Sequence, residues 1–446
     1  MKAIVSPSRF EGTVKAIASK SHAHRILICA AFADKDTLVI CEETSEDINA
    51  TVDCLIHLGA GIKRVENGFL VHPINFNKDN SLNDIDKDND NEEDNVEDTI
   101  NTSIDINCGE SGSTLRFLLP IVCTLGKNVN IYSKGRLPQR PLSPLYEELI
   151  KHGANISKQG EVPLKTFGQI TSGEYTLPAN ISSQYISGLL FALPMLDGDS
   201  VINLTEKIES KSYIDMTIDV LKIFNIEIKW KDNQIFIKGN QSYISPNKII
   251  VEGDWSNVAF WLSAGALSHN YIKCTNLNIN SLQGDKEVVD ILKKFGADIN
   301  IEKGPLVSIS VKDGKKNGIT IDANNIPDLV PILALVASVS NGVTQITNAS
   351  RLRLKESDRI ESVVNTLSKL GADIKATEDG MIIVGKDKLV GGEIDSYNDH
   401  RIAMMATIAA IVSENPVIIN NASAVNKSYG GFYNDFISLG GKIILE

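Results

Sequence analysis

One pattern of hydrophobic and polar residues occurs six times along the chain. Apolar residues at helical spacing lead into a glycine or an asparagine, and an alternating strand pattern follows directly. A residue that tolerates a positive φ angle at this place is typical of the left-handed cap that ends a helix. The six caps predicted in this way are Gly59, Gly153, Asn225, Gly296, Gly371 and Gly440.

The spacing of these caps indicates a repeated structural unit. Successive caps are 94, 72, 71, 75 and 69 residues apart, and a 28-residue acidic insertion accounts for the excess in the first interval. A unit of about seventy residues holds several strands and two helices, and six units divide naturally into two domains of three. We predict one domain over 1–19 plus 246–446 and the other over 20–245. The strand at 2–5 should pair within the C-terminal half, and the active site should lie between the two domains.

The segment 76–103 interrupts this pattern. It contains ten Asp and Glu residues and two Lys residues, so it carries −8 of the formal net charge of −12. Because so polar a stretch buries too little surface to offset its ordering entropy, we predict a disordered acidic insertion within the second domain. Some of its acidic residues match the spacing of a calcium-binding loop, but the sequence lacks the turn glycine and flanking amphipathic helices, so we attribute the match to chance.

The bulk composition is that of an ordinary globular enzyme. Hydrophobic residues make up 42% of the 446 positions and charged residues 22%, and the longest apolar stretches are too short to span a bilayer. The chain has no basic tract and its net charge is acidic, so we expect no nucleic-acid partner. Six cysteines without a Cys-x-x-Cys pair suit the reducing cytoplasm and imply neither a metal site nor disulfides.

Arginine recurs near the start of predicted helices, where a cation is unfavourable unless an anion binds there. A solvated or intrahelical ion pair explains any one case, but four in matching places of a repeat indicate a shared anion site. The four are Arg25, Arg116, Arg359 and Arg401. Further groups suited to phosphate or carboxylate are the serine and amide cluster at 182–184 and the loop residues Arg136, Arg140, Lys211 and Lys427.

Two carboxylates occur beside these cations in the sequence. Asp328 follows Pro327, and Glu356 lies between Lys355 and Ser357. A helix cap is the structural alternative for Asp328, and an ordinary ion pair is the alternative for Glu356. In a cation-rich pocket, both become candidates for proton transfer.

Nine segments resemble, in this order, the signature segments of the 5-enolpyruvylshikimate-3-phosphate (EPSP) synthase family and span nearly the whole chain: SKSHAHR, ESGSTLRFLLP, RPLSPL, SSQYISGLL, ESKSYID, IPDL, LKESDRI, YNDHRIAM and KSYGGFYNDF. The resemblance implies an α+β fold, a two-domain inside-out α/β barrel with three βαβαββ units in each domain. It implies a transferase that moves the enolpyruvyl group of phosphoenolpyruvate to the 5-hydroxyl of shikimate 3-phosphate through a tetrahedral ketal intermediate, releasing phosphate. The implied enzyme acts in the shikimate pathway to chorismate and the aromatic amino acids, is a target of glyphosate and needs no cofactor.

The resemblance also implies the site residues. Those that would bind shikimate 3-phosphate are Lys20, Ser21, Arg25, Ser182, Ser183, Gln184, Ser210, Asp328 and Lys355. Those that would bind phosphoenolpyruvate are Lys20, Gly112, Arg140, Gln184, Arg359, Arg401 and Lys427. The catalytic residues would be Asp328, which takes the hydroxyl proton, Glu356, which exchanges a proton with C3, and Lys20. Glu110 and Arg351 occupy positions where many family members have asparagine, so neither is assigned a contact.

Two alternatives remain open. The enolpyruvyl transferase that acts on UDP-N-acetylglucosamine shares the fold and the donor, but it normally carries an acidic or thiol proton donor on a mobile loop, and the region before Arg140 offers only Cys123 within an apolar run. An RNA-terminal phosphate-binding protein of similar repeat construction explains the cations but not the pair Asp328 and Glu356. We expect a monomer with two small-molecule substrates and no membrane partner.

Overall fold

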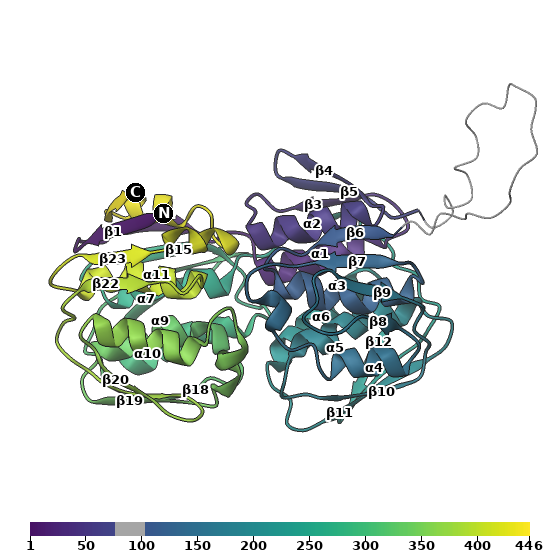
Figure 1. The fold of residues 1–446 in the computed structure, drawn as a ribbon. Helices are drawn as coiled ribbons and strands as arrows, with labels where there is room; N and C mark the ends of the chain where they lie inside the picture. The colour runs from purple at the N-terminus through teal and green to yellow at the C-terminus, as the bar shows by residue number, and fades with distance from the viewer. Residues whose placement is uncertain (76–102) are drawn as a thin grey trace, which may run out of the picture.

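The computed structural model describes residues 1–75 and 103–446, and in these residues the strands form six four-stranded sheets of one design (Figure 1). In each sheet the first two strands are parallel, and the third and fourth add antiparallel neighbours. The predicted acidic insertion at 76–103 lies, except for Ser103, outside the described residues. One sheet design repeated six times confirms the six units expected from the caps.

The strands of three sheets lie between positions 37 and 250, and the other three sheets are built from strands between positions 272 and 445 and the first two strands of the chain. The first three are β14(Lys248–Ile250)-β3(Thr37–Ile40)-β5(Gly68–His72)-β4(Gly61–Val65), β6(Ile104–Asn107)-β7(Val129–Tyr132)-β9(Leu164–Phe167)-β8(Asn155–Ile156) and β10(Glu174–Pro178)-β11(Ser200–Thr205)-β13(Gln234–Ile237)-β12(Ile228–Lys231). The other three are β2(Gly12–Lys15)-β15(Ile272–Leu277)-β17(Val307–Lys312)-β16(Asp298–Glu302), β18(Thr320–Asp322)-β19(Val343–Thr347)-β21(Met381–Val384)-β20(Asp373–Ala376) and β22(Gly392–Asp395)-β23(Val417–Asn420)-β1(Lys2–Ser6)-β24(Lys442–Leu445).

Each unit carries an inner helix that is buried along most of its length and a second helix that ends at the predicted cap. The inner helices are α1(Lys20–Ala31), α3(Gly112–Thr124), α5(Ser183–Ala192), α7(Trp255–Ala266), α9(Val330–Ser338) and α11(His400–Ala409). The second helices are α2(Glu46–His57), α4(Leu145–Lys151), α6(Lys211–Ile223), α8(Val288–Phe295), α10(Arg359–Lys369) and α12(Phe432–Ser438). All six caps have positive φ angles between 63° and 111°, so the conformation expected from the repeat is confirmed.

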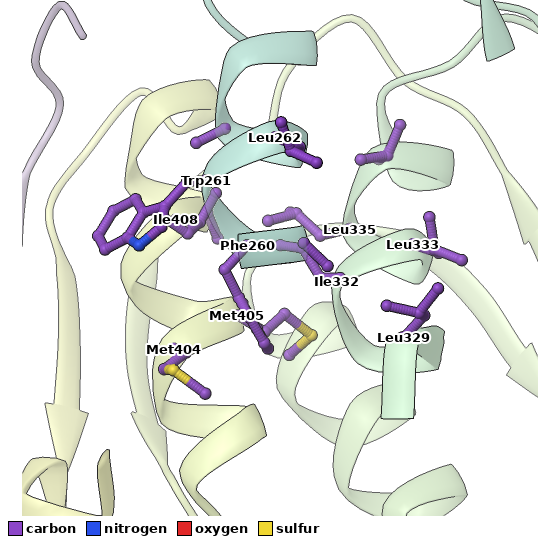
Figure 2. Packing of buried hydrophobic residues seen from close by; sticks show 14 of the residues in the cluster. Phe260, Trp261, Leu262, Leu329, Ile332, Leu333, Leu335, Met404, Met405 and Ile408 are labelled. Carbon is purple, nitrogen blue, oxygen red and sulfur yellow. The ribbon is translucent and has the colours of Figure 1, made fainter. Parts of the chain in front are cut away.

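Beyond their first two turns, the inner helices are largely apolar on all sides, because the neighbouring helices and the sheets enclose them. Every residue of α7, α9 and α11 is buried. Figure 2 shows Phe260 of α7 beside Ile332 and Leu335 of α9 and Met405 of α11. In β21, buried and exposed residues alternate, and in β16, exposed and half-buried residues alternate. This alternation is typical of a sheet with one solvated face. Helices therefore fill the centre of each half, and the sheets cover them.

The buried hydrophobic residues form two clusters, one in each half of Figure 1. The first core takes residues between positions 23 and 251, and the second takes residues 3–17 together with residues between 255 and 439. Strand β1 pairs with β23 and β24, as expected for the first strand of the chain. Strand β14 pairs with β3 in the first core, so the chain leaves that core a few residues beyond position 246.

The two crossings between the cores lie side by side. Ala18 forms an antiparallel bridge with Gly253, and Ser19 donates its backbone N–H to the carbonyl oxygen of Glu252 at 2.8 Å. The next residue, Lys20, begins α1 and donates its N–H to the Asp254 carboxylate at 3.1 Å. The pair of crossings therefore places the starts of α1 and α7, one from each core, next to each other.

Candidate active site

Residues at the starts of five of the six inner helices line one cleft between the cores, whose empty space, including the part open to solvent, is about 1170 Å³. They include Lys20 of α1, Gly112 of α3 and Ser183 of α5 from the first core, and Ser256 of α7 and Arg401 of α11 from the second. The short 3-10 helix Pro327–Leu329, which leads into α9, adds its residues to the same cleft. Because the first backbone N–H groups of a helix lack partners within it and carry partial positive charge, this arrangement favours anions.

The structure brings nearly all of the predicted site residues together in this cleft. Those that line it are Lys20, Ser21, Arg25, Gly112, Arg140, Ser182, Ser183, Gln184, Ser210, Asp328, Lys355, Glu356, Arg359 and Arg401. Lys427 does not line the cleft, although its neighbour Ser428 does. Arg136 donates to the Glu356 carbonyl oxygen at 3.4 Å. The prediction of a loop position for Lys211 is wrong, because Lys211 is the first residue of α6, where it pairs with Asp215 on the exposed side of the helix.

One buried guanidinium organises the carboxylates of the site. Arg359 has a relative exposure of 1%, and it donates from Nη1 to Asp328 Oδ1 at 2.7 Å and from Nη2 to Glu356 Oε2 at 2.6 Å. Its Nε donates to Asp399 Oδ2 at 2.8 Å, and Asp399 also caps the N-terminus of α11. Charge-assisted bonds from a planar guanidinium fix the directions of its partners, so Asp328 and Glu356 are held side by side.

The same cations keep both carboxylates ionised. Burial favours the neutral form of Asp328, but Arg401, Lys355 and Arg359 outweigh burial and hold its pKa well below the usual range. For Glu356, burial is likewise outweighed, by Arg359 and Arg140, and its pKa also lies well below normal. Asp328 makes no capping bond to α9, so its side chain belongs to the site and not to a helix terminus.

Serine hydroxyls and further cations line another part of the cleft. Ser182 caps α5, and Ser210, in the left-handed conformation with φ of 51°, precedes α6. Arg351 Nη2 donates to Ser210 Oγ at 3.1 Å. Arg25 is held by Thr217 Oγ1 at 2.8 Å and by two backbone oxygens, and burial lowers its pKa to about 10. Neutral hydroxyl donors and positively charged guanidinium groups are thus found together in this part of the cleft.

Two arginines lie against the start of α3. A Cβ atom built on Gly112 would lie 2.8 Å from Arg140 Nη1 and 2.7 Å from Arg116 Nη1. Arg116 also donates to Gln184 Oε1 at 3.1 Å. Burial, followed by the charge of Arg140, lowers the pKa of Arg116 to about 10. Any side chain at position 112 would displace these two guanidinium groups, and only glycine leaves them in place.

Some groups of the site were not assigned a role from the sequence. Arg116 was recognised as an arginine at a helix start, and its position in the repeat was the signal that could have placed it in the cleft. Tyr213 and His400 also line the cleft, and within the described residues the buried Nε atoms of Arg116, Arg140 and Arg401 have no hydrogen-bond partner. No group of His, Cys, Asp and Glu suited to a metal ion occurs among the described residues.

The cleft therefore combines buried cations, helix N-termini and two carboxylates fixed on one arginine. Multiply charged small anions fit the cations, and a paired Asp and Glu can exchange protons with a bound molecule. Fold and site together define an enzyme that transfers a group between anionic metabolites.

In the described part of the chain, no helix has the length and apolar character needed to cross a membrane.

Comparison with known proteins identifies the family. The family model described as EPSP synthase (3-phosphoshikimate 1-carboxyvinyltransferase) matches residues 4–436. The 3-phosphoshikimate 1-carboxyvinyltransferases of Clostridium acetobutylicum and Clostridium perfringens are 46% and 43% identical over 444 and 442 residues, which cover 98% and 99% of this chain and 97% and 98% of theirs. The solved EPSP synthase of Acinetobacter baumannii has a TM-score of 0.79 at 26% identity and covers 100% of both chains. The chain belongs to the EPSP synthase family.

Family membership establishes the reaction. The chain transfers the enolpyruvyl group of phosphoenolpyruvate to shikimate 3-phosphate, a step of the shikimate pathway of aromatic biosynthesis. Its substrates are the two small molecules expected from the sequence, and the α+β inside-out architecture is confirmed by the solved structures. The alternatives, a transferase for UDP-N-acetylglucosamine and an RNA-terminal phosphate-binding protein, are therefore set aside.

Proposed function

We propose that the cleft between the cores binds both substrates side by side and that Asp328 and Glu356 carry the protons of the enolpyruvyl transfer. The observation that carries this proposal is the bonding of Arg359, which holds both carboxylates among the cations of the cleft. An ordinary surface ion pair would need neither the burial of Arg359 nor its third carboxylate partner, Asp399. The arrangement places an acid–base pair beside a strongly anion-attracting region.

For phosphoenolpyruvate, we propose binding at the start of α3 and α11. Arg140 reaches this region from the first core, and Arg359 and Arg401 reach it from the second. The backbone at Gly112, the ammonium of Lys20 and the amide of Gln184 complete the donor side, and the ammonium of Lys427, next to the cleft residue Ser428, would reach the donor from the edge of the cleft. Arg401 also donates to the Asp328 carbonyl oxygen at 3.2 Å, which orients its guanidinium within the cleft. Guanidinium groups from two directions suit a ligand that carries both a phosphate and a carboxylate.

For shikimate 3-phosphate, we propose the hydroxyl-rich side of the cleft. The phosphate would accept hydrogen bonds from Ser182, Ser183 and Ser210 and from the ammonium of Lys355, while Ser21 and Arg25 would contact the rest of the molecule. Lys355 lies 3.7 Å from Asp328, so a substrate held by Lys355 has its reacting hydroxyl within reach of that carboxylate. Lys20 and Gln184, at the starts of α1 and α5, would touch both substrates.

The proposed chemistry proceeds through a tetrahedral ketal phosphate. The 5-hydroxyl oxygen adds to C2 of phosphoenolpyruvate, Asp328 takes the hydroxyl proton, and Glu356 gives a proton to C3. The C2–O bond to phosphate then breaks, the departing phosphate takes the proton from Asp328, and Glu356 takes back a methyl proton as the double bond forms. The cations stabilise the negative charge that accumulates on phosphate and carboxylate. No cofactor takes part in this sequence.

The low pKa of Glu356 in the ligand-free site can be reconciled with its role as an acid. Arg359 and Arg140 lower its pKa, and Arg140 Nη1 lies 3.7 Å from its Oε1. The carboxylate and phosphate of phosphoenolpyruvate compete for the same two guanidinium groups and add negative charge nearby. Both effects raise the pKa of Glu356 when the donor binds, so the proton is taken up at the step that needs it.

Phosphate release with different acceptors tests this assignment of the cleft. The enzyme is incubated with phosphoenolpyruvate and either shikimate 3-phosphate or UDP-N-acetylglucosamine, and free phosphate is measured. We expect release with shikimate 3-phosphate only, and loss of release when Arg359 is replaced by Met. Release with the nucleotide sugar, or full release from Arg359→Met, would contradict the proposed site.

Alkaline pH should weaken the binding of shikimate 3-phosphate. Burial lowers the pKa of Lys355 to about 8, although Asp328 opposes the shift. The amine that holds the phosphate therefore loses its charge as the pH rises through about 8, and kcat/KM for shikimate 3-phosphate should fall by up to about tenfold per pH unit above that value. In Lys355→Arg, whose guanidinium stays charged, this alkaline limb should disappear, and its persistence would assign the limb to another group.

A methyl group at position 112 should interfere with the donor side. Gly112→Ala pushes against the tips of Arg140 and Arg116, so KM for phosphoenolpyruvate should rise by about tenfold. Inhibition by glyphosate, which is bulkier than the substrate, should weaken further still. Gly430→Ala is the matched control, because a methyl there meets no described atom within 4 Å. Inhibition that is equal in Gly112→Ala and wild type would place Gly112 outside the donor site.

The two cores also support a proposal about domains. We propose that 1–19 plus 246–446 and 20–245 move as two domains about the paired crossings at Ala18 and Gly253, except that β14 moves with the second of these because it pairs with β3. We also propose a monomer that acts in the cytoplasm, where its six buried cysteines stay reduced. Anions bound between cations of both cores draw the domains together. Small-angle scattering should show a smaller radius of gyration with shikimate 3-phosphate plus glyphosate than without ligands. An unchanged radius, or the mass of a dimer, would argue against this proposal.

A further inference from the structure

Glu110 connects the two cores at the edge of the active site. It lies directly before Ser111, the residue that caps α3, and so belongs to the first core. Its Oε2 accepts a hydrogen bond from Lys427 Nζ at 2.6 Å, and both its oxygens lie 3.2 Å from Asn398 Nδ2. Lys427 and Asn398 come from the C-terminal part of the chain, about three hundred residues away.

The surroundings of Glu110 leave little freedom to its carboxylate. Gly135 has a φ angle of 63°, and a Cβ atom there would lie 2.6 Å from the Glu110 carboxyl carbon, so only glycine leaves room for it. On the other side, Lys427 has a relative exposure of 7% and donates a second bond to the Asn398 carbonyl oxygen at 2.6 Å. A nearly buried ammonium is thus held by one carboxylate and one carbonyl group.

This contact joins two structures that border the donor site. Asn398 has a φ angle of 53° and precedes Asp399, which caps α11 and accepts a bond from Arg359. Glu110 stands two residues before Gly112, where α3 begins. The Lys427 ammonium therefore links the start of α3, through Glu110, with the start of α11, through Asn398.

We propose that Glu110 is a positioning residue for the donor: its carboxylate holds the Lys427 ammonium at the edge of the cleft, next to the start of α3. The inference rests on the proposed role of Lys427 in binding phosphoenolpyruvate. A free lysine side chain loses much rotamer freedom when it binds a ligand, and a carboxylate that orders it beforehand reduces this loss. A hydrogen bond from the ammonium to a carboxylate is stronger than one to the oxygen of a neutral amide, so an amide at this position holds the ammonium less firmly.

Steady-state kinetics of Glu110→Gln test the proposal. KM for phosphoenolpyruvate should rise by about tenfold, while kcat and KM for shikimate 3-phosphate stay within about twofold of wild type, because only donor binding depends on Lys427. The matched control is Glu302→Gln, which removes the charge from another 2.6 Å pair, Lys273 with Glu302, inside one sheet of the second core. A KM for phosphoenolpyruvate that is unchanged or lower in Glu110→Gln would overturn the proposal, since a lower value means that Glu110 competes with the donor.

Lys427→Met and the double variant separate this inference from the role of Lys427 itself. If Glu110 acts through Lys427, adding Glu110→Gln to Lys427→Met changes KM for phosphoenolpyruvate no further. If Lys427→Met leaves this KM unchanged, the role of Lys427 in donor binding is wrong and the positioning role falls with it. If Lys427→Met raises the KM and Glu110→Gln raises it independently, Lys427 binds the donor but Glu110 acts by another route. Thermal unfolding of each variant confirms that the fold is intact.

Discussion

Glu356→Gln is expected to turn over about two to four powers of ten more slowly than the wild-type enzyme. Glutamine has the same size and can still accept the hydrogen bond from Arg359 Nη2, which spans 2.6 Å in the wild type. It cannot give a proton to C3 or take one back. The affinity for phosphoenolpyruvate should therefore change little, so rapid-quench measurement of a single turnover isolates the chemical step.

The matched control for this variant lies on α10, the helix that begins three residues after Glu356. Glu361 follows on α10, is exposed and pairs with Arg353 at 3.3 Å. Glu361→Gln removes the same charge five residues from Glu356 and should keep wild-type turnover, because exposed ion pairs contribute little. If Glu356→Gln turned over as fast as Glu361→Gln, Glu356 would be only an ion-pair partner of Arg359, and Lys20 or Asp328 would have to supply the proton.

Asp328→Asn is expected to lower turnover by about two to three powers of ten. The amide cannot take the proton from the 5-hydroxyl, so addition to C2 slows even when both substrates are bound. It also leaves Arg359 and Arg401 without a carboxylate that they contact at 2.7 Å and 3.2 Å. The binding of shikimate 3-phosphate should weaken less than the rate falls, and pre-steady-state turnover at saturating substrates measures the rate alone.

The exposed Asp387, on the loop after β21, provides the control for the lost charge. Asp387→Asn should bind both substrates and turn over as the wild type does. If Asp328→Asn lost binding of shikimate 3-phosphate in proportion to its rate, Asp328 would act as a binding residue, and the hydroxyl proton would leave by another path.

The architecture could be predicted from the sequence because its signals are local. Each helix cap stands within a few residues of the apolar pattern that it ends, and Gly59, Asn225 and Gly296 all have the positive φ angle that this pattern requires. The exit from the first core was harder to place. Strand β14 has the same local pattern whichever sheet it joins, and its pairing with β3 depends on residues two hundred positions away.

Part of the site could also be predicted, because some of its signals are local in the sequence. Arg25 and Arg401 stand at helix starts, so their unfavourable position is visible in the sequence itself. The partners of Arg359 are not visible, because Asp328 and Asp399 lie 31 and 40 residues away and become neighbours only when α9, α10 and α11 assemble. Resemblance gave Lys427 a role in the cleft but could not show that its ammonium is held by Glu110.

The exchange of solvent deuterium into the C3 methylene tests the central claim most directly, because it follows the proton that Glu356 is proposed to carry. The enzyme is incubated in deuterium oxide with phosphoenolpyruvate and shikimate 3-phosphate, and label in the recovered donor and in the product is measured by mass spectrometry. We predict that exchange in Glu356→Gln falls in step with turnover, whereas Glu361→Gln exchanges at the wild-type rate. Exchange at the wild-type rate in Glu356→Gln would show that another group protonates C3 and would contradict the account.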